Sequence, residues 1–179
     1  MSEPDVASSD PTNLQTLVRR DGDDYVINGR KWFITGAAHP DCRLLIVMGR
    51  SGDGDTKHGN HSMILVPMET PDLTLVRNIP IMQHETPEGH CELLFRDVRV
   101  PAANLLGEEG QGFAMAQARL GPGRIHHCMR TIGQCELALE MMCDRALERR
   151  AFGRYLADQA NVQEWIADTR LEIDQARLL

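Results

Sequence analysis

The sequence lacks the patterns that would place it among membrane, secreted or nucleic-acid-binding proteins. No run of apolar residues approaches the roughly 20 that a membrane-spanning helix requires, and the first ten residues are polar and acidic, unlike a signal peptide. An excess of basic residues is also missing, because the net charge is −7 and the pI is about 5.5. We therefore expect no integral membrane segment and no nucleic-acid partner, whereas a few local arginines remain able to bind a phosphate group.

Metal-binding patterns are missing too, although cysteine and histidine are both present. The five cysteines include no Cys-x-x-Cys pair, and the seven histidines include no His-x-x-x-His pair. On a helix the adjacent His126 and His127 point about 100° apart and cannot hold one ion together. We expect no metal site and reduced thiols, with Cys128, Cys135 and Cys143 as small buried side chains on one helix face.

The first 107 residues have the pattern of a β domain. Short apolar or alternating runs occupy residues 16–19, 25–27, 30–35, 44–48, 63–66, 73–76, 91–95 and 98–100. Asn28-Gly29 is the strongest two-residue hairpin signal, and it predicts a turn between the second and third of these runs. Residues 51–61, rich in Gly and Asp, predict an exposed loop. Many short strands separated by turn residues predict a β-barrel or a sandwich.

After residue 107 the apolar spacing becomes helical. Residues 112–150 are predicted to form a long helix, in which Pro122 causes a kink or divides the segment into two abutting helices. The Phe-Gly pair at residues 152 and 153 predicts the end of this helix, and a second helix is expected from near Ala157 to the end of the chain. That second helix has no capping residue at its C-terminal end, which predicts a truncated segment. The predicted fold class is α+β.

Four short segments have residue types that are suited to binding a ligand. Residues 2–10 predict a turn rich in backbone N–H groups and hydroxyls, and residues 32–35 (Trp-Phe-Ile-Thr) place an aromatic ring and a hydroxyl on one strand. Residues 120–124 (Leu-Gly-Pro-Gly-Arg) put an arginine beside two glycines, and residues 149–153 (Arg-Arg-Ala-Phe-Gly) put two arginines at a helix end. Each segment alone is more simply explained as a surface loop, core packing, a helix kink or a helix cap.

Taken in this order, the four segments resemble the motifs of the acyl-CoA dehydrogenase family. The run Glu-Pro-Asp-Val-Ala-Ser-Ser-Asp is most similar to the subfamily of acyl-CoA dehydrogenase family members 10 and 11. The resemblance extends over almost the whole chain. It implies the middle β domain of that family over residues 1–107, with its first strand truncated. Over residues 108–179 it implies the first long helices of an incomplete C-terminal helical bundle.

The resemblance implies FAD as the cofactor and matches part of its site to the N-terminal segment. Met1 and Ser2 match the strand end that contacts the flavin ring, with Ser2 in place of the family's Thr. Ser9 matches the family's serine where flavin and acyl-CoA meet. Ser8 is the alternative, because the segment is one residue longer than the commonest form.

A second part of the implied flavin site lies in the run 32–35. Phe33, Ile34 and Thr35 match the segment that lies against the flavin, with Thr35 near the hydride-accepting atom N5. Phe33 stands where the family usually has Trp, and Trp32 stands beside it. A stacking ring is retained if Phe33 faces the flavin, whereas an indole N–H donor at that position is lost.

The helical segment is matched to the nucleotide ends of the two ligands. Gly121 and Arg124 match positions beside the acyl-CoA, where the arginine meets its nucleotide end. Arg149 and Phe152 match the Arg-x-x-Phe-Gly motif, which reaches the adenosine-pyrophosphate half of the FAD in a neighbouring subunit. The planar fork of a guanidinium suits phosphate recognition.

The implied reaction converts an acyl-CoA to the trans-2-enoyl-CoA, with a carboxylate as base and FAD as hydride acceptor. The resemblance places that base beyond Leu179, so we nominate no catalytic residue and expect the isolated segment to be inactive. It also implies an electron-transfer flavoprotein as partner and a homodimer or homotetramer. The implied location is cytoplasmic in a bacterium, and mitochondrial or peroxisomal in a eukaryote. The alternatives are an acyl-CoA oxidase and a non-catalytic module that binds flavin or another protein.

Overall fold

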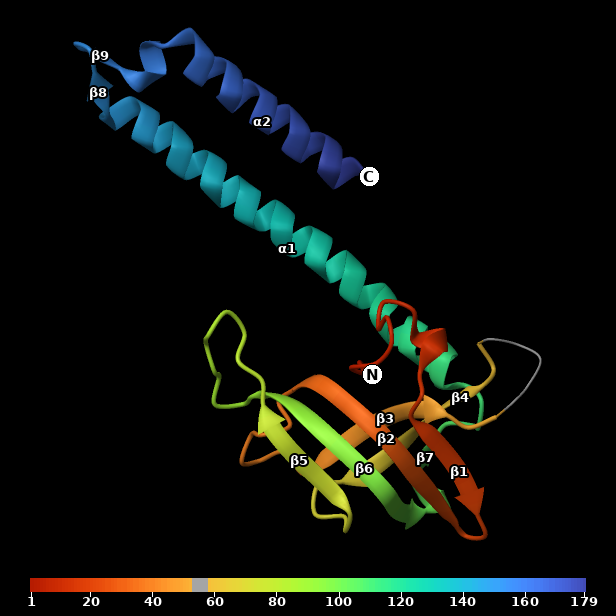
Figure 1. The fold of residues 1–179 in the computed structure, drawn as a ribbon. Helices are drawn as coiled ribbons and strands as arrows, with labels where there is room; N and C mark the ends of the chain where they lie inside the picture. Colours follow the sequence, from red (N-terminus) through yellow and green to blue (C-terminus); the bar gives the residue numbers. More distant parts are fainter. Residues whose placement is uncertain (53–57) are drawn as a thin grey trace. The chain divides into compact units, whose positions relative to one another are not determined.

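The computed structural model describes residues 1–52 and 58–179, which form two compact units, Met1–Gln117 and Ala118–Leu179. The first unit is built around a β-sheet and the second around helices (Figure 1). The predicted α+β class is therefore confirmed.

Seven strands form the sheet of the first unit, in the order β5-β6-β2-β1-β3-β4-β7. Neighbouring strands are antiparallel except β1 and β3, which are parallel. Two short 3₁₀ helices, η1 (Pro11–Asn13) and η2 (Ala102–Asn104), precede β1 and β7. The strands are β1 (Leu17–Asp21), β2 (Asp24–Thr35), β3 (Leu44–Arg50), β4 (His61–Pro67), β5 (Leu73–Asn78), β6 (His90–Pro101) and β7 (Leu105–Leu106).

The core of the first unit collects side chains from strands that are far apart in the sheet order. Val18 of β1, Ile27 of β2, Val47 of β3, Ile64 of β4 and Phe95 of β6 are buried in one cluster. Strands that are distant in the order of the sheet, such as β6 and β4, therefore share a single core. The sheet must bend around this core. This shared core positions the end of β2, where the predicted ring-contacting residues lie.

The prediction of a hairpin turn at Asn28-Gly29 is wrong, because both residues lie inside the long strand β2. The turn lies instead between Asp21 and Asp24, which pair across β1 and β2. The Asn28 side chain exchanges two hydrogen bonds of 2.9 Å with Asp97, in a bulge of β6. A Cβ at Gly29 would stand 2.7 Å from the Cα of Thr16. The pair serves a bulge and a close backbone approach, which use the same residue types as a turn.

The predicted loop at residues 51–61 lies partly outside the described residues. Its last residue, His61, begins β4 and is 1% exposed, so the prediction of an exposed loop is wrong at that position.

A second, smaller cluster lies in the first unit. It contains Leu14, Met48, Met63 and Ala116, and through Ala116 it packs the first turns of helix α1 (Gly112–Glu148) within this unit.

The second unit contains most of helix α1 (Gly112–Glu148) and all of α2 (Ala160–Leu178). Pro122 lies within α1 without dividing it. Between the helices, β8 (Arg150–Ala151) and β9 (Arg154–Tyr155) form a small hairpin, followed by the 3₁₀ helix η3 (Leu156–Asp158), so α2 begins three residues later than predicted. The predicted burial of Cys128 and Cys135 is wrong, since both thiols are exposed.

The two helices of the second unit are joined by charged side chains. Both terminal nitrogens of the Arg170 guanidinium on α2 donate to the Glu136 carboxylate on α1, at 2.7 and 2.9 Å, and Arg177 pairs with the same carboxylate. None of the helices in the described part of the chain is long and apolar enough to cross a membrane.

Candidate functional site

The end of β2 carries a bulge that displays an aromatic ring. Lys31 pairs with Leu93 and Ile34 with Cys91, so two residues of β2 oppose one residue of β6. Within this bulge Phe33 has φ 51° and is 42% exposed. A left-handed backbone at a bulky residue costs about 1–2 kcal/mol and persists only where the surroundings hold it. The bulge therefore presents a ring at the surface that a regular strand would place differently.

A hydroxyl and a cavity lie immediately beyond that ring. Thr35, the last residue of β2, has its Oγ1 3.0 Å from Nδ1 of His90, its pairing partner on β6. Ile34 and Thr35 line a cavity of about 310 Å³. Most of its other lining side chains are apolar. The cavity is also lined by Met1, Lys31, Gly36, Ala37, Cys42, Leu44, Leu45, Ile46, Val47, Leu93 and Phe95.

The N-terminal segment reaches the same bulge through its backbone. The carbonyl oxygen of Ser2 accepts a hydrogen bond of 3.1 Å from the N–H of Trp32. The Ser8 hydroxyl accepts from the N–H of Glu3 at 3.0 Å and donates to its carbonyl oxygen at 3.2 Å. Ser8 and Ser9 are both exposed. The structure thus brings Ser2 to the bulge at Trp32 and Met1 to Lys31 just before it. Of the two candidate serines, Ser8 closes the turn through its hydroxyl.

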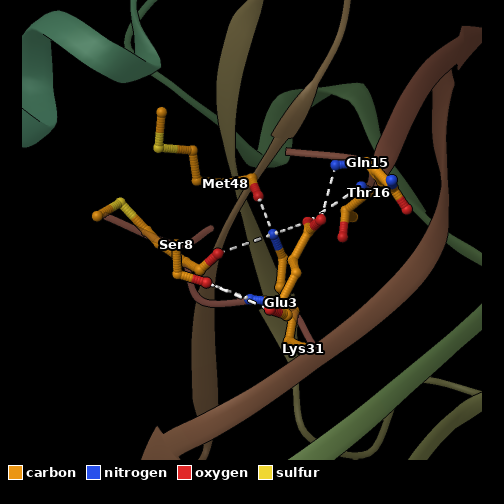
Figure 2. A network of polar contacts seen from close by, with 7 residues as sticks. Glu3, Ser8, Gln15, Thr16, Lys31 and Met48 are labelled. Carbon is orange, nitrogen blue, oxygen red and sulfur yellow. Dashed lines mark hydrogen bonds and ion pairs between the residues drawn. The ribbon is translucent and has the colours of Figure 1, made fainter. Parts of the chain in front are cut away.

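A buried ion pair fixes this segment against β2 (Figure 2). The Lys31 Nζ donates 2.7 Å hydrogen bonds to Oε1 of Glu3 and to the carbonyl oxygen of Met48. The Glu3 carboxylate also accepts from the backbone N–H groups of Gln15 at 2.6 Å and Thr16 at 3.0 Å. Both charged side chains are 3% exposed. Three segments that are distant in the sequence therefore meet at one carboxylate and one ammonium group.

Burial and hydrogen bonding shift the pKa values of this pair. Burial acts to raise the pKa of Glu3, but the hydrogen bonds from Lys31, Thr16 and Gln15 outweigh it and hold that pKa below its usual value. Burial lowers the pKa of Lys31, and the Glu3 carboxylate partly offsets this shift.

A second carboxylate lies directly opposite the bulge. Glu92 of β6, 2% exposed, pairs with Arg30 of β2 and with Arg77 of β5, whose Nε is 2.7 Å away. The hydrogen bond from Arg77 and those from Arg30 hold the pKa of Glu92 below its usual value, although burial opposes them. Because consecutive strand residues point to opposite faces, Arg30 and Lys31 project from opposite sides of β2. Ion pairs therefore hold β2 on both faces just before Phe33.

Sequence reasoning missed Glu3, Lys31 and Glu92 as parts of this site. One signal was available for Lys31, which shares the inward side of β2 with the buried Tyr25 and Ile27 at a spacing of two residues. A lysine on the buried face of a strand indicates a buried partner. No local pattern names Glu3 as that partner, because 28 residues separate the two.

The remaining predicted site residues lie in the second unit. Phe152 and Gly153, with φ 54° and 82°, form the tip of the β8–β9 hairpin, where Phe152 is fully exposed. Arg149 is exposed at the foot of this hairpin, where its carbonyl oxygen accepts from the N–H of Leu156 at 2.9 Å.

The glycine-rich segment of the second unit lies within helix α1. A Cβ added to Gly121 would meet nothing within 4 Å, and Arg124 is exposed one turn later. The described residues contain no group of three His, Cys, Asp or Glu side chains that could hold a metal ion.

Known proteins resemble this chain in sequence. The family model for the acyl-CoA dehydrogenase middle domain matches residues 1–98, and the model for the C-terminal domain matches residues 110–179. The Mycobacterium tuberculosis protein named "Probable acyl-CoA dehydrogenase FadE2" is 59% identical over 100% of this chain and 44% of its own length. Human acyl-CoA dehydrogenase family member 11 is 50% identical over 100% of this chain and 23% of its own length.

Solved structures show the same relationship. The acyl-CoA dehydrogenase from Geobacillus kaustophilus superposes with a TM-score of 0.81 at 31% identity, over 99% of this chain and 46% of that one. The chain thus spans less than half of the length of the relatives that it matches. The two family models together cover nearly all of its residues, in the order that the four motifs predict. The chain belongs to the acyl-CoA dehydrogenase family.

Proposed function

We propose that this chain forms the flavin-contacting part of an FAD-dependent enzyme that oxidises an acyl-CoA to its trans-2-enoyl-CoA. The observation that carries the proposal is the bulge of β2, which exposes the Phe33 ring and is followed by Ile34 and Thr35 at a largely apolar cavity. Family membership gives this arrangement its chemical meaning.

The residues of the bulge fit a flavin ring. A flavin is a flat, largely apolar ring system with hydrogen-bonding atoms along one edge, and it requires an apolar surface next to polar groups. Phe33 and Ile34 offer the apolar surface, and the Thr35 hydroxyl offers a group that can donate or accept. Met1 and Ser2 are proposed as further contacts, because the Ser2 carbonyl is bonded to the bulge itself.

When bound, FAD would supply the hydride-accepting atom of the reaction. The chain's own residues would bind and orient: Thr35 beside that atom, Ser9 where the flavin and the acyl group meet, and Gly121 with Arg124 along the acyl-CoA. Arg149 and Phe152 are proposed to contact the adenosine-pyrophosphate half of the FAD of a neighbouring subunit. The chain covers 44% of the length of its mycobacterial relative. We therefore propose that the carboxylate base comes from a part of the full-length protein outside this chain.

The same proposal extends to organisation and partners. The middle domain is taken as residues 1–107 and the start of the helical domain as residues 108–179. We propose an electron-transfer flavoprotein as the electron acceptor and a homodimer or homotetramer as the assembly. The compartment is proposed to be the cytoplasm in a bacterium, or the mitochondrion or peroxisome in a eukaryote.

Flavin absorbance of the full-length protein tests the proposal. Acyl-CoAs of graded chain length, added without oxygen, should bleach the oxidised flavin band, and the substitution Phe33→Ala should weaken FAD retention. Val76→Ala, an exposed site on the edge strand β5, is the matched control and should leave retention unchanged. Bound flavin that no acyl-CoA bleaches would contradict the proposed reaction, and rapid recovery of the band in air would identify an oxidase instead.

A further inference from the structure

We infer that Glu3 and Lys31 are positioning residues, whose buried ion pair fixes the position of the N-terminal turn relative to the Phe33 bulge. The inference rests on the proposed function, because those two segments are the proposed contacts of the flavin ring. It adds a role for two residues that are not proposed to touch the ligand themselves.

The location of the pair supports this role. Lys31 stands two residues before Phe33, at the last regular pairing of β2 before the bulge. Its ammonium group contacts the Glu3 carboxylate and the Met48 carbonyl oxygen, and its Nζ is 3.4 Å from the Met1 carbonyl oxygen. A single side chain thus connects β2, β3 and the N-terminal segment at the edge where the ring is proposed to lie.

The Glu3 carboxylate restrains the N-terminal segment on its side of the ion pair. Its hydrogen bonds to the N–H groups of Gln15 and Thr16 join the beginning and the end of residues 3–16. The Ser8 hydroxyl then binds the Glu3 backbone from within that loop. Ser9 is the next residue in the same turn, so the Ser8–Glu3 hydrogen bonds help to place it, together with the 2.9 Å hydrogen bond from the Asp10 N–H to the Ala7 carbonyl oxygen.

The opposite face of β2 has a matching restraint. Glu92 is the single residue of β6 that opposes the bulge, and its carboxylate binds Arg30, the residue just before Lys31. The bulge thus begins where β2 is held by one ion pair on each face. Such restraint is what a left-handed Phe33 requires, since an unrestrained strand would relax toward regular pairing.

Energetics favours positioning over stability as the reason for the pair. A buried ion pair contributes little net stability compared with apolar side chains of similar volume, because both charges lose their hydration. Its hydrogen bonds are directional, however, and fix the relative placement of the groups that make them. A role in positioning therefore predicts that removing both charges leaves the sheet as stable as before but makes the N-terminal turn and the Phe33 bulge more mobile.

Hydrogen exchange of backbone amides tests this in the protein without FAD. Lys31→Met leaves the Glu3 charge unpaired, so the amides of residues 1–16 and 32–36 should exchange about a hundredfold faster. The double variant E3Q/K31M removes both charges and should keep β4 protected while the same two segments still exchange faster. Asp21→Asn is the matched control, because it breaks an exposed pair with Arg99 at the other end of β2 and should change neither segment.

The FAD-loaded protein provides the second readout. The E3Q/K31M variant should lose FAD about tenfold faster than the wild-type protein, and its flavin absorption band should be broader. Asp21→Asn should match the wild type in both. Unchanged exchange and unchanged FAD loss in the double variant would overturn the inference, as would exchange that rises equally over the whole sheet. A wild-type protein that binds no FAD would contradict the proposed function instead, while the exchange data would still decide whether the pair orders the two segments.

Discussion

The two units of the chain bury their apolar side chains to very different extents. In the first unit Ile27, Ile64 and Val98 are 0% exposed within one shared cluster. In the second unit Leu137 of α1 and Trp165 of α2 are 58% and 56% exposed. The bent sheet therefore supplies its own core, whereas the helices keep apolar faces that their mutual contacts do not cover.

The ion pairs of the two units differ in the same way. The Glu3–Lys31 pair is buried and connects three segments of the first unit. The pairs of Glu136 with Arg170 and Arg177 lie near the surface of the second unit, where water and salt weaken them. Contacts in the first unit thus determine geometry, and those in the second add modest stability between two helices.

The largest contrast should come from truncating one apolar side chain in each unit. Phe95→Ala should lower the free energy of unfolding of the first unit by about 3–5 kcal/mol, because Phe95 is 1% exposed in the core. Leu137→Ala should change that of the second by less than about 0.5 kcal/mol. Urea unfolding can follow each unit separately, since Trp32 lies in the first and Trp165 in the second, and each can be replaced by Phe in turn.

Equal losses in the two units would contradict this contrast. They would mean that the helical unit has a tightly packed core around Leu137. Coincident unfolding curves for the two tryptophans, with the Phe95→Ala shift present in both, would show that the units unfold as one cooperative body.

Adding a methyl group to one glycine in each unit should change the free energy of unfolding by less than Phe95→Ala does, and with opposite signs in the two units. Gly29→Ala should destabilise the first unit by about 1–3 kcal/mol, because the new Cβ would meet the Thr16 backbone. Gly133→Ala should stabilise the second unit by up to about 1 kcal/mol, since nothing lies near its Cβ and alanine favours a helix. Thermal unfolding measures both signs, and a stabilising Gly29→Ala would refute the close approach.

Gly121 extends this comparison from stability to the proposed ligand. Gly121→Ala should stabilise helix α1 by up to about 1 kcal/mol, as Gly133→Ala does, because both sites are open. If acyl-CoA lies against Gly121, however, the added methyl group should weaken its binding about tenfold. Calorimetric titration of the full-length protein with an acyl-CoA distinguishes the two variants. Equal affinity in both would remove Gly121 from the proposed site.

The sequence predicted the elements better than it predicted the site, for a physical reason. Apolar periodicity is a property of a single segment, so β3, β4 and the long helix α1 were predicted close to their observed bounds. Asn28-Gly29 misled because a bulge and a close backbone approach use the same residue types as a turn. The ion pair of Glu3 and Lys31 depends on which strands become neighbours, and this information is not contained in either segment.

The smallest effect that we predict separates the two kinds of ion pair by acid and salt. Hydrogen bonds from Arg170 and Arg177 lower the pKa of Glu136 from 4.5 to about 2. A carboxyl whose pKa is lowered in the folded state contributes stability above its unfolded pKa, and loses it as the pH falls toward the folded value. The stability of the second unit should therefore decrease between about pH 4.5 and pH 2, with a smaller decrease in Glu136→Gln.

Salt sharpens that measurement, because exposed charges are screened and buried ones much less so. Far-UV circular dichroism of the helices, recorded during acid titration at low and high salt, should show a weaker Glu136 contribution at high salt. The pKa of Glu3 is also lowered, so Glu3 should likewise lose its contribution in acid, but this loss should depend little on salt. Exchange of the amides of residues 1–16 during the same titration reports on Glu3. A salt-sensitive response there would mean that the Glu3–Lys31 pair is open to water, and it could not then hold the bulge.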